Sequence, residues 1–153
     1  DALNCVAKQP EILLRKKAPI IITPHPGEMS RLTGLATPLV NAERERVALD
    51  FAQKYGVVTV LKGAGTVIAS PNGKVLVNPT GNSGMATGGS GDVLAGMTAS
   101  ILAQGASAFS SAAAAVYLHG LAGDIAAEKY GKISMLPTDL INCIPLAYKR
   151  CGF

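Results

Sequence analysis

The sequence of 153 residues contains no tryptophan, and aromatic residues make up only 5% of it. Although the net charge is +4, there is no dense basic stripe with interleaved aromatic residues, which argues against nucleic-acid binding. The most apolar region, residues 97–127, is interrupted by Gln104, His119 and Asp124, so it does not have the pattern of a membrane span. We therefore expect neither a nucleic acid nor a membrane among the partners.

Cysteine is also scarce. The three cysteines, Cys5, Cys143 and Cys151, are an odd number, and they form neither a CxxC pair nor a metal-ligand spacing. No signal-peptide pattern is present. These features predict reduced thiols, no dedicated metal site and a cytoplasmic location.

Glycine and small apolar residues are abundant. Hydrophobic residues make up 48% of the chain, charged residues only 16%, and there are 17 glycines. This balance and this length are typical of one compact α/β enzyme domain with a real core. The chain begins at Asp1 without a methionine, so we expect a fragment whose first part is missing.

Hydrophobic periodicity and turn residues predict alternating strands and helices. Strands are expected at 20–22 and 57–61, and a hairpin at 66–70 and 74–78 around Pro71-Asn72-Gly73. Helical segments are expected at 2–7, 10–14, 28–32, 42–55, 92–104, 107–130 and 138–148. Asn41 and Thr138 are expected to cap two of these helices, and Pro145 to kink or break the last one. The order predicts an α/β domain based on a βαβ unit with parallel strands.

The stretch from Asn78 to Asp92 carries the strongest chemical signal. Its glycines allow several backbone N–H groups to converge on one point, and a helix begins where it ends. A helix N-terminus adds free donors and partial positive charge, so Gly88, Gly89, Ser90 and Gly91 are predicted to hold a phosphate. Asp92 could then accept the proton of a hydroxyl that is being phosphorylated. The alternative is a glycine-rich loop with an ordinary acidic N-cap.

Two further candidate sites follow predicted strands, at the edge where open α/β sheets bind ligands. In Lys62-Gly63-Ala64-Gly65-Thr66 the lysine could reach nucleotide phosphates, but a tight β-turn explains the same glycines equally well. His25 lies between two prolines, where it could touch a ligand or simply face solvent. His119, in the middle of a predicted helix near Gly120 and Gly123, is expected to be structural and to mark close helix packing.

The segments 23–29, 61–66 and 78–96 together resemble the ADP/ATP-dependent NAD(P)H-hydrate dehydratases of the ribokinase-like superfamily, also called the YjeF C-terminal domain family. The resemblance extends over nearly the whole chain, including residues 118–124. Only slight departures occur: Ser83 replaces a common proline and Ser90 a common threonine. The resemblance implies a layered α/β/α fold with a mainly parallel sheet. Residues 1–153 would be the C-terminal portion of one such domain.

The resemblance also implies an activity and its residues. A nucleotide, ADP or ATP with Mg²⁺, would phosphorylate the ring hydroxyl of hydrated NADH or NADPH (NADHX, NADPHX), and phosphate loss would restore the ring. His25 and Asp92 would contact this substrate, with Asp92 as the base. The nucleotide would be held by Lys62, Gly63, Ala64, Gly65, Thr66 and Gly91, and the moving phosphoryl group by Gly88, Gly89, Ser90 and Gly91. Many members assemble as tetramers, so a homo-oligomer is implied.

Two other functions remain open at this point. A small-molecule kinase of the same superfamily, acting on a vitamin precursor or a sugar, would share the phosphate loop and Asp92 but leave the phosphate on its product. A nucleotide-binding regulatory module without turnover would need no acid beside the phosphate.

Overall fold

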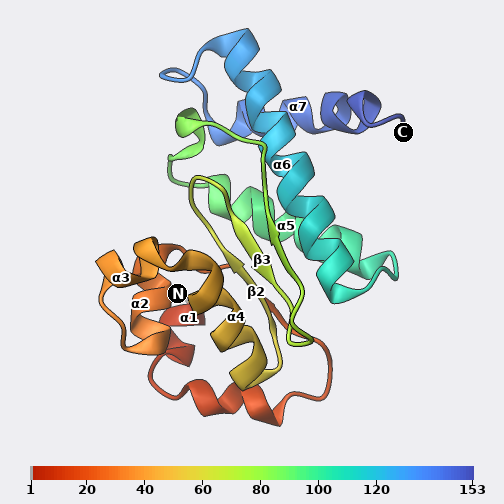
Figure 1. The fold of residues 1–153 in the computed structure, drawn as a ribbon. Helices are drawn as coiled ribbons and strands as arrows, with labels where there is room; N and C mark the ends of the chain where they lie inside the picture. The colour runs from red at the N-terminus through yellow and green to blue at the C-terminus, as the bar shows by residue number, and fades with distance from the viewer. Residues whose placement is uncertain (1) are drawn as a thin grey trace. The chain divides into compact units, whose positions relative to one another are not determined.

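The computed structural model describes residues 2–153 as two compact units, Asp1–Val77 and Asn78–Phe153 (Figure 1). The first unit contains α1 (Ala2–Val6), η1 (Pro10–Arg15), β1 (Ile21–Ile22), α2 (Pro26–Thr33), α3 (Thr37–Ala42), α4 (Arg44–Tyr55), β2 (Val58–Leu61), β3 (Val67–Ala69) and β4 (Val75–Val77). The second unit contains η2 (Ser83–Met85), α5 (Ser90–Ala103), α6 (Ala108–Tyr130) and α7 (Pro137–Arg150).

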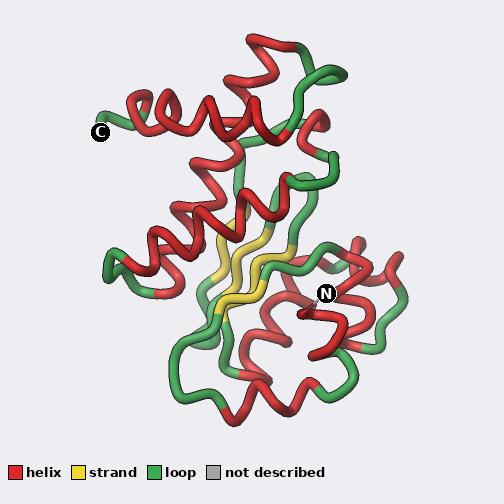
Figure 2. The backbone as a smooth tube through the Cα atoms, turned by 180° about the vertical axis from the view of Figure 1, so that it is seen from behind, coloured by secondary structure: helices red, strands yellow, loops and turns green. Residues whose placement is uncertain are grey.

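The strands of the first unit form one four-stranded sheet in the order β1-β2-β3-β4 (Figure 2). β1 pairs with β2 in parallel, with Ile21 opposite Val58. The pairs β2–β3 and β3–β4 are antiparallel, and β3 and β4 form the predicted hairpin. The fold predicts a mainly parallel sheet. Of the three strand pairs among the described residues, only β1–β2 is parallel.

Helix α4 carries the apolar face that builds the core of the first unit. Val47, Ala48, Phe51, Ala52 and Tyr55 recur at helical spacing and are buried, as their sequence periodicity predicts. The helix packs on β2 and β3, as Figure 1 shows. It ends at Gly56, whose φ of 65° is the left-handed conformation that a helix C-cap favours.

The second unit is built on α6, a helix of 23 residues that packs against both α5 and α7. Four of its alanines, Ala112, Ala115, Ala122 and Ala126, are buried and let the neighbouring helices approach. Ser107 caps the helix by accepting a hydrogen bond from the backbone N–H of Ser110. The predicted helix over 107–130 is therefore confirmed.

Three predicted boundaries were wrong. Asn41 caps nothing, since it lies inside α3, and α4 begins later, at Arg44. α5 starts at Ser90, two residues before Asp92. α7 starts at Pro137, whose fixed φ suits a first helical position, so Thr138 lies inside the helix.

Other sequence expectations concern α7, the thiols and membrane insertion. Helix α7 continues through Pro145 to Arg150 and is not broken there. Cys5, Cys143 and Cys151 are free thiols in the described part of the chain, and Cys143 is buried. Among residues 2–153 no helix is both long and apolar enough to cross a membrane.

Candidate active site

The predicted phosphate loop ends in a cluster of free backbone donors. Gly89 is the N-cap of α5 and has a φ of 98°, a conformation that favours glycine. Its carbonyl oxygen accepts the hydrogen bond of the Asp92 N–H at 3.0 Å. Within residues 2–153, the N–H groups of Gly88, Gly89 and Gly91 have no protein acceptor. Three neighbouring donors at a helix N-terminus can therefore hold an anion.

Asp92 lies in the first turn of α5, and its side chain is exposed. It is not the N-cap, since Gly89 takes that position and no side chain caps this helix. The alternative of an ordinary acidic N-cap is therefore wrong. In the described part of the chain the Asp92 carboxylate has no hydrogen-bond or ion-pair partner, so it is available to accept a proton beside the anion loop.

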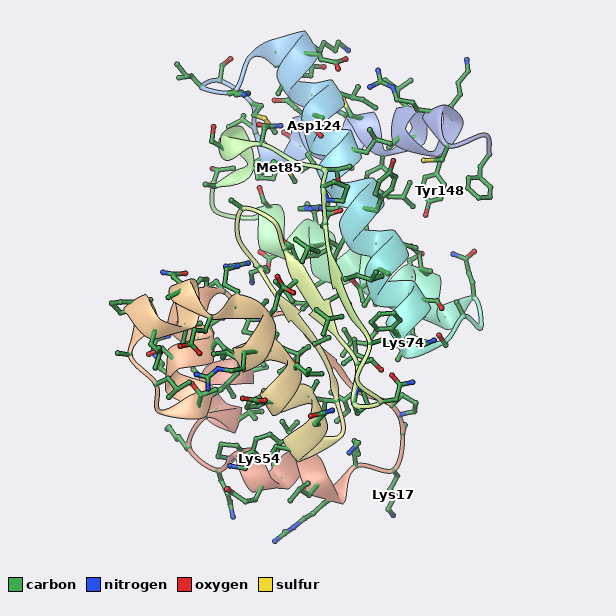
Figure 3. All side chains as sticks on the ribbon, viewed as in Figure 1. Lys17, Lys54, Lys74, Met85, Asp124 and Tyr148 are labelled. Atoms are coloured by element: carbon green, nitrogen blue, oxygen red, sulfur yellow. The ribbon has the colours of Figure 1, made fainter. Side chains whose placement is uncertain are left out.

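The beginning of the glycine loop is fixed to α6 by side chains. Asp124 accepts two hydrogen bonds at 2.9 Å, one from the backbone N–H of Gly81 and one from the side-chain amide of Asn82. Thr80 donates its hydroxyl to the carbonyl oxygen of Tyr117 at 2.9 Å. Figure 3 shows Met85, from η2 in this loop, beside Asp124 of α6. These contacts determine the path of the loop before it reaches the anion cluster.

Gly120 and Gly123 make room for this loop. A Cβ on Gly120 would lie 2.8 Å from the carbonyl carbon of Thr80, and one on Gly123 would lie 2.8 Å from Cγ of Met85. The prediction of close packing at these glycines is confirmed, but the partner is the loop and not another helix. A side chain on Gly120 would displace the loop backbone at Thr80, whereas one on Gly123 would require the Met85 side chain to move.

His119 is buried, and its ring connects the same helix to the anion cluster. Its Nε2 lies 2.9 Å from the carbonyl oxygen of Ser90, so this nitrogen must carry the proton and donate. Burial lowers the pKa of His119, and the hydrogen bond to Ser90 opposes that effect only in part. The structural role predicted for His119 is thus supported: a neutral imidazole holds the first turn of α5.

In the first unit, His25 is the N-cap of α2. Its Nδ1 accepts hydrogen bonds from the backbone N–H groups of Gly27 at 3.1 Å and Glu28 at 3.3 Å. Glu28 reciprocates, since its Oε2 accepts the backbone N–H of His25 at 2.7 Å, which completes a capping box. The ring is half-exposed, and because Nδ1 accepts these two hydrogen bonds the ring proton is on Nε2, which lies 3.5 Å from Oε2 of Glu28.

Lys62 contacts the same segment of the chain that contains His25 and Glu28. Its ammonium donates to the carbonyl oxygen of Thr23 at 2.7 Å and lies 3.6 Å from Oε2 of Glu28. Its backbone N–H donates to the carbonyl oxygen of Pro24 at 2.8 Å. The structure therefore brings together His25 and Lys62, two predicted ligand-binding residues, through Glu28. The sequence analysis missed Glu28, although its position three residues after the cap is the signal of a capping box.

Arg44 holds the loop that follows Lys62. Its guanidinium donates to the carbonyl oxygens of Leu61 at 2.8 Å, Lys62 at 3.3 Å and Gly65 at 3.4 Å. A Cβ on Gly63 would lie 2.6 Å from the same guanidinium, and the φ of Gly63 is 147°. Burial lowers the pKa of Arg44 from its usual value. The sequence analysis missed Arg44, because no local pattern links it to a loop 17 residues away.

A cavity of about 500 Å³ opens beside this loop, entirely within the first unit. Ala64 and Gly65 of the loop line it, together with Val67, Val77 and the start of α4. The loop is also a tight turn, in which Thr66 donates its hydroxyl to the carbonyl oxygen of Gly63 at 3.0 Å. The loop from Lys62 to Thr66 is therefore a tight turn that also lines the cavity, so the two interpretations of its glycines do not exclude each other.

The predicted site residues thus form two groups, each within one unit. His25 and the loop from Lys62 to Thr66 belong to the first unit, and the loop from Gly88 to Asp92 belongs to the second. In residues 2–153 no group of three or more His, Cys, Asp or Glu side chains is arranged to hold a metal ion. A magnesium ion here would therefore fit as one carried on nucleotide phosphates, the usual mode of Mg²⁺ at phosphoryl-transfer sites.

Comparison with known proteins identifies the family. The family described as NAD(P)H-hydrate dehydratase matches residues 1–146, and this chain belongs to it. The chain is 46% identical, over 98% of its own length, to the bifunctional NAD(P)H-hydrate repair enzyme Nnr of Moorella thermoacetica. It is 43% identical, over 86% of its length, to the ADP-dependent (S)-NAD(P)H-hydrate dehydratase of Neisseria meningitidis serogroup B.

A solved structure agrees with this assignment. The ADP/ATP-dependent NAD(P)H-hydrate dehydratase of Bacillus subtilis, co-crystallised with ATP and Mg²⁺, superposes with a TM-score of 0.83 at 38% identity over 86% of this chain. The ribokinase-like α/β fold class is thereby confirmed. The chain spans 28% of the Moorella protein, 45% of the Neisseria protein and 48% of the Bacillus chain.

Proposed function

We propose that this chain is part of an enzyme that uses ADP or ATP to dehydrate NADHX and NADPHX back to NADH and NADPH. The observation that carries the proposal is the anion cluster: three free N–H groups at Gly88, Gly89 and Gly91 beside an unpartnered Asp92. Membership in the NAD(P)H-hydrate dehydratase family supports the choice of substrate. The proposed dehydration restores a damaged redox cofactor and is therefore a metabolite-repair reaction.

The proposed steps use few groups of this chain. Asp92 accepts the proton of the ring hydroxyl while the oxygen attacks the terminal phosphoryl group, whose bond to the rest of the nucleotide breaks. The N–H groups of Gly88, Gly89 and Gly91 stabilise the charge on the moving phosphoryl oxygens. Electrons from the ring nitrogen then expel phosphate, and loss of a ring proton restores the double bond.

Binding is assigned to the other group of residues. In this proposal the loop from Lys62 to Thr66, held by Arg44, contacts the nucleotide. His25 presents its Nε2–H to the hydrated dinucleotide, because Nδ1 is occupied by the cap of α2. Mg²⁺, when bound, offsets negative charge on the nucleotide phosphates.

A kinase of the same superfamily would share the anion cluster and the base. The family match and relatives at 37–46% identity named as hydrate dehydratases or repair enzymes favour dehydration. A binding module without turnover is disfavoured by Asp92, which has no structural partner in the described residues and would only repel a bound phosphate.

The proposal also covers the domain to which the chain belongs, its cellular location and its oligomeric state. Residues 1–153 would form the C-terminal portion of one ribokinase-like domain, which is supported by a match to about half of the Bacillus chain. The missing N-terminal portion would continue the sheet at β1, which is an edge strand of the first unit. A cytoplasmic location is supported by the free thiols, and a homo-tetramer is proposed from the family resemblance alone.

Asp92→Asn in the full-length protein tests the proposal. Asparagine keeps the shape but loses the basic oxygen, so turnover should fall about 10²–10⁴-fold while nucleotide affinity, measured by calorimetry, stays nearly unchanged. Asp50→Asn, at an exposed acid of α4, is the matched control and should retain full activity. Mass spectrometry of the wild-type reaction should show NADH and no stable phosphorylated product. A mutant with more than about half of the wild-type rate would refute the role of Asp92.

A further inference from the structure

One carboxylate oxygen of the first unit faces three nitrogen atoms from two ligand-binding residues. Oε2 of Glu28 accepts the backbone N–H of His25 at 2.7 Å, lies 3.5 Å from Nε2 of the same ring and lies 3.6 Å from Nζ of Lys62. The Glu28 side chain is only 16% exposed, and the Lys62 side chain 26%. Partial burial strengthens the attraction between these charges relative to an ion pair in bulk water.

The capping box accounts for only part of this arrangement. A cap needs an acceptor for the His25 N–H, and a neutral amide oxygen would serve that purpose. The position of the Lys62 ammonium, in contrast, depends also on the negative charge, which attracts it more strongly than the neutral oxygen of an amide would. Thr23 supplies the remaining restraint through its carbonyl oxygen, 2.7 Å from Nζ.

We propose that Glu28 is a positioning residue that holds the ammonium of Lys62 and the imidazole of His25 in one fixed arrangement for the dehydration reaction. The inference rests on the proposed function, in which Lys62 contacts the nucleotide and His25 the hydrated dinucleotide. If Lys62 or His25 moves relative to the Glu28 carboxylate, the electrostatic interaction of that carboxylate with the other side chain also changes. The carboxylate thus links the two ligand-binding sides.

A kinetic signature follows from the competition for Lys62. In the wild type, Glu28 and the nucleotide phosphates both attract the ammonium, so the carboxylate weakens ground-state binding and restricts where Lys62 can lie. Removal of the charge frees Lys62 to bind phosphate more tightly, but without the orientation that the reaction needs. Nucleotide affinity should rise and the rate of turnover should fall, which is a combination that simple loss of folding cannot produce.

Glu28→Gln and Glu28→Ala in the full-length enzyme separate charge from capping. Glutamine keeps an acceptor for the His25 N–H, whereas alanine removes both the acceptor and the charge. Glu11→Gln, at an exposed acid of η1, is the matched control. Three quantities are measured for each variant: the thermal unfolding midpoint, the affinity for ADP by calorimetry without dinucleotide, and kcat and KM with hydrated NADH.

The expected result is that E28Q unfolds within about 2 °C of the wild type, binds ADP at least about threefold more tightly and loses at least about tenfold in kcat. E28A should lose kcat to a similar extent and also unfold at a lower temperature. Wild-type kcat and ADP affinity in E28Q would show that only the cap matters and would overturn the proposal. A midpoint lowered equally in E28Q and E28A would also overturn it.

The ADP measurement keeps this inference separate from the proposed function. If the wild type does not turn over hydrated NADH, the proposed function fails. The affinities of wild type and E28Q for ADP still differ if Glu28 controls Lys62, and they coincide if it does not.

Discussion

The main chain of Thr80 crosses helix α6 directly over Gly120, 40 residues later in the sequence. A Cβ on Gly120 would lie 2.8 Å from the Thr80 carbonyl carbon, which is closer than real Cβ contacts come. The same segment is held by the hydrogen bonds of Asp124 to Gly81 and Asn82. The approach of the loop to α6 is therefore a steric requirement for the path that leads to the anion cluster.

Gly120→Ala should displace this loop. The added methyl group should destabilise the protein by about 1–3 kcal/mol, as overpacking of a close contact does, and lower the rate of turnover. Gly96→Ala in α5 is the matched control, since a Cβ there meets nothing within 4 Å. Alanine in an open helical position should leave stability unchanged or raise it by about 0.5–1 kcal/mol. Urea unfolding of both variants makes the comparison, and a G120A protein as stable as G96A would contradict it.

Arg44→Lys should weaken nucleotide binding. Arginine reaches three carbonyl oxygens of the nucleotide loop at once, whereas the single ammonium of lysine cannot match this fork. A loss of roughly 1.4 kcal/mol, about one hydrogen bond, corresponds to a tenfold higher KM for nucleotide. Arg150→Lys is the control, because Arg150 is exposed and pairs only with Glu128 in the described residues. Equal KM values for R44K and R150K would exclude the role of Arg44.

Acid should destabilise the protein through His119. Because burial lowers the pKa of His119 in the folded state, the unfolded chain binds a proton first as the pH falls below the ordinary value of 6.5. This contribution to stability is therefore complete above that value and is lost toward lower pH. In His119→Gln the amide can still donate to the Ser90 carbonyl oxygen but does not titrate. Urea unfolding at pH 7.5 and 5.5 should show a smaller decrease for H119Q than for the wild type, and equal decreases would contradict the explanation.

Local sequence signals predicted the elements that depend on neighbouring residues. Gly34 and Gly56 end α2 and α4 in the left-handed conformation, and the predicted hairpin around Asn72 forms as β3 and β4. Asn41 misled the assignment of α4, because its amide suits an N-cap, whereas it lies inside a separate helix, α3, that begins at Thr37 with Pro38 in its first turn.

The sequence predicted those parts of the candidate site whose residues are adjacent in the chain. The loop from Gly88 to Asp92 and the loop after Lys62 were found, since glycine, lysine and acid lie side by side. Arg44, which holds the loop after Lys62, was missed because it acts on carbonyl oxygens 17 to 21 residues away. The ion pair of Glu28 with Lys62 spans 34 residues and has no local signal either, unlike the capping box that Glu28 forms with His25.

The most direct measurement of the proposed activity follows absorbance and phosphate in one reaction. Hydrated NADH lacks the dihydronicotinamide chromophore, so dehydration restores near-ultraviolet absorbance. The full-length protein is incubated with hydrated NADH, Mg²⁺ and either ADP or ATP. We predict that absorbance recovery and free phosphate rise together in equal amounts, because each phosphorylation at the anion cluster of Gly88, Gly89 and Gly91 ends in phosphate loss. Nucleotide consumption that leaves a stable phosphorylated small molecule, without any gain in absorbance, would contradict dehydration and identify a kinase.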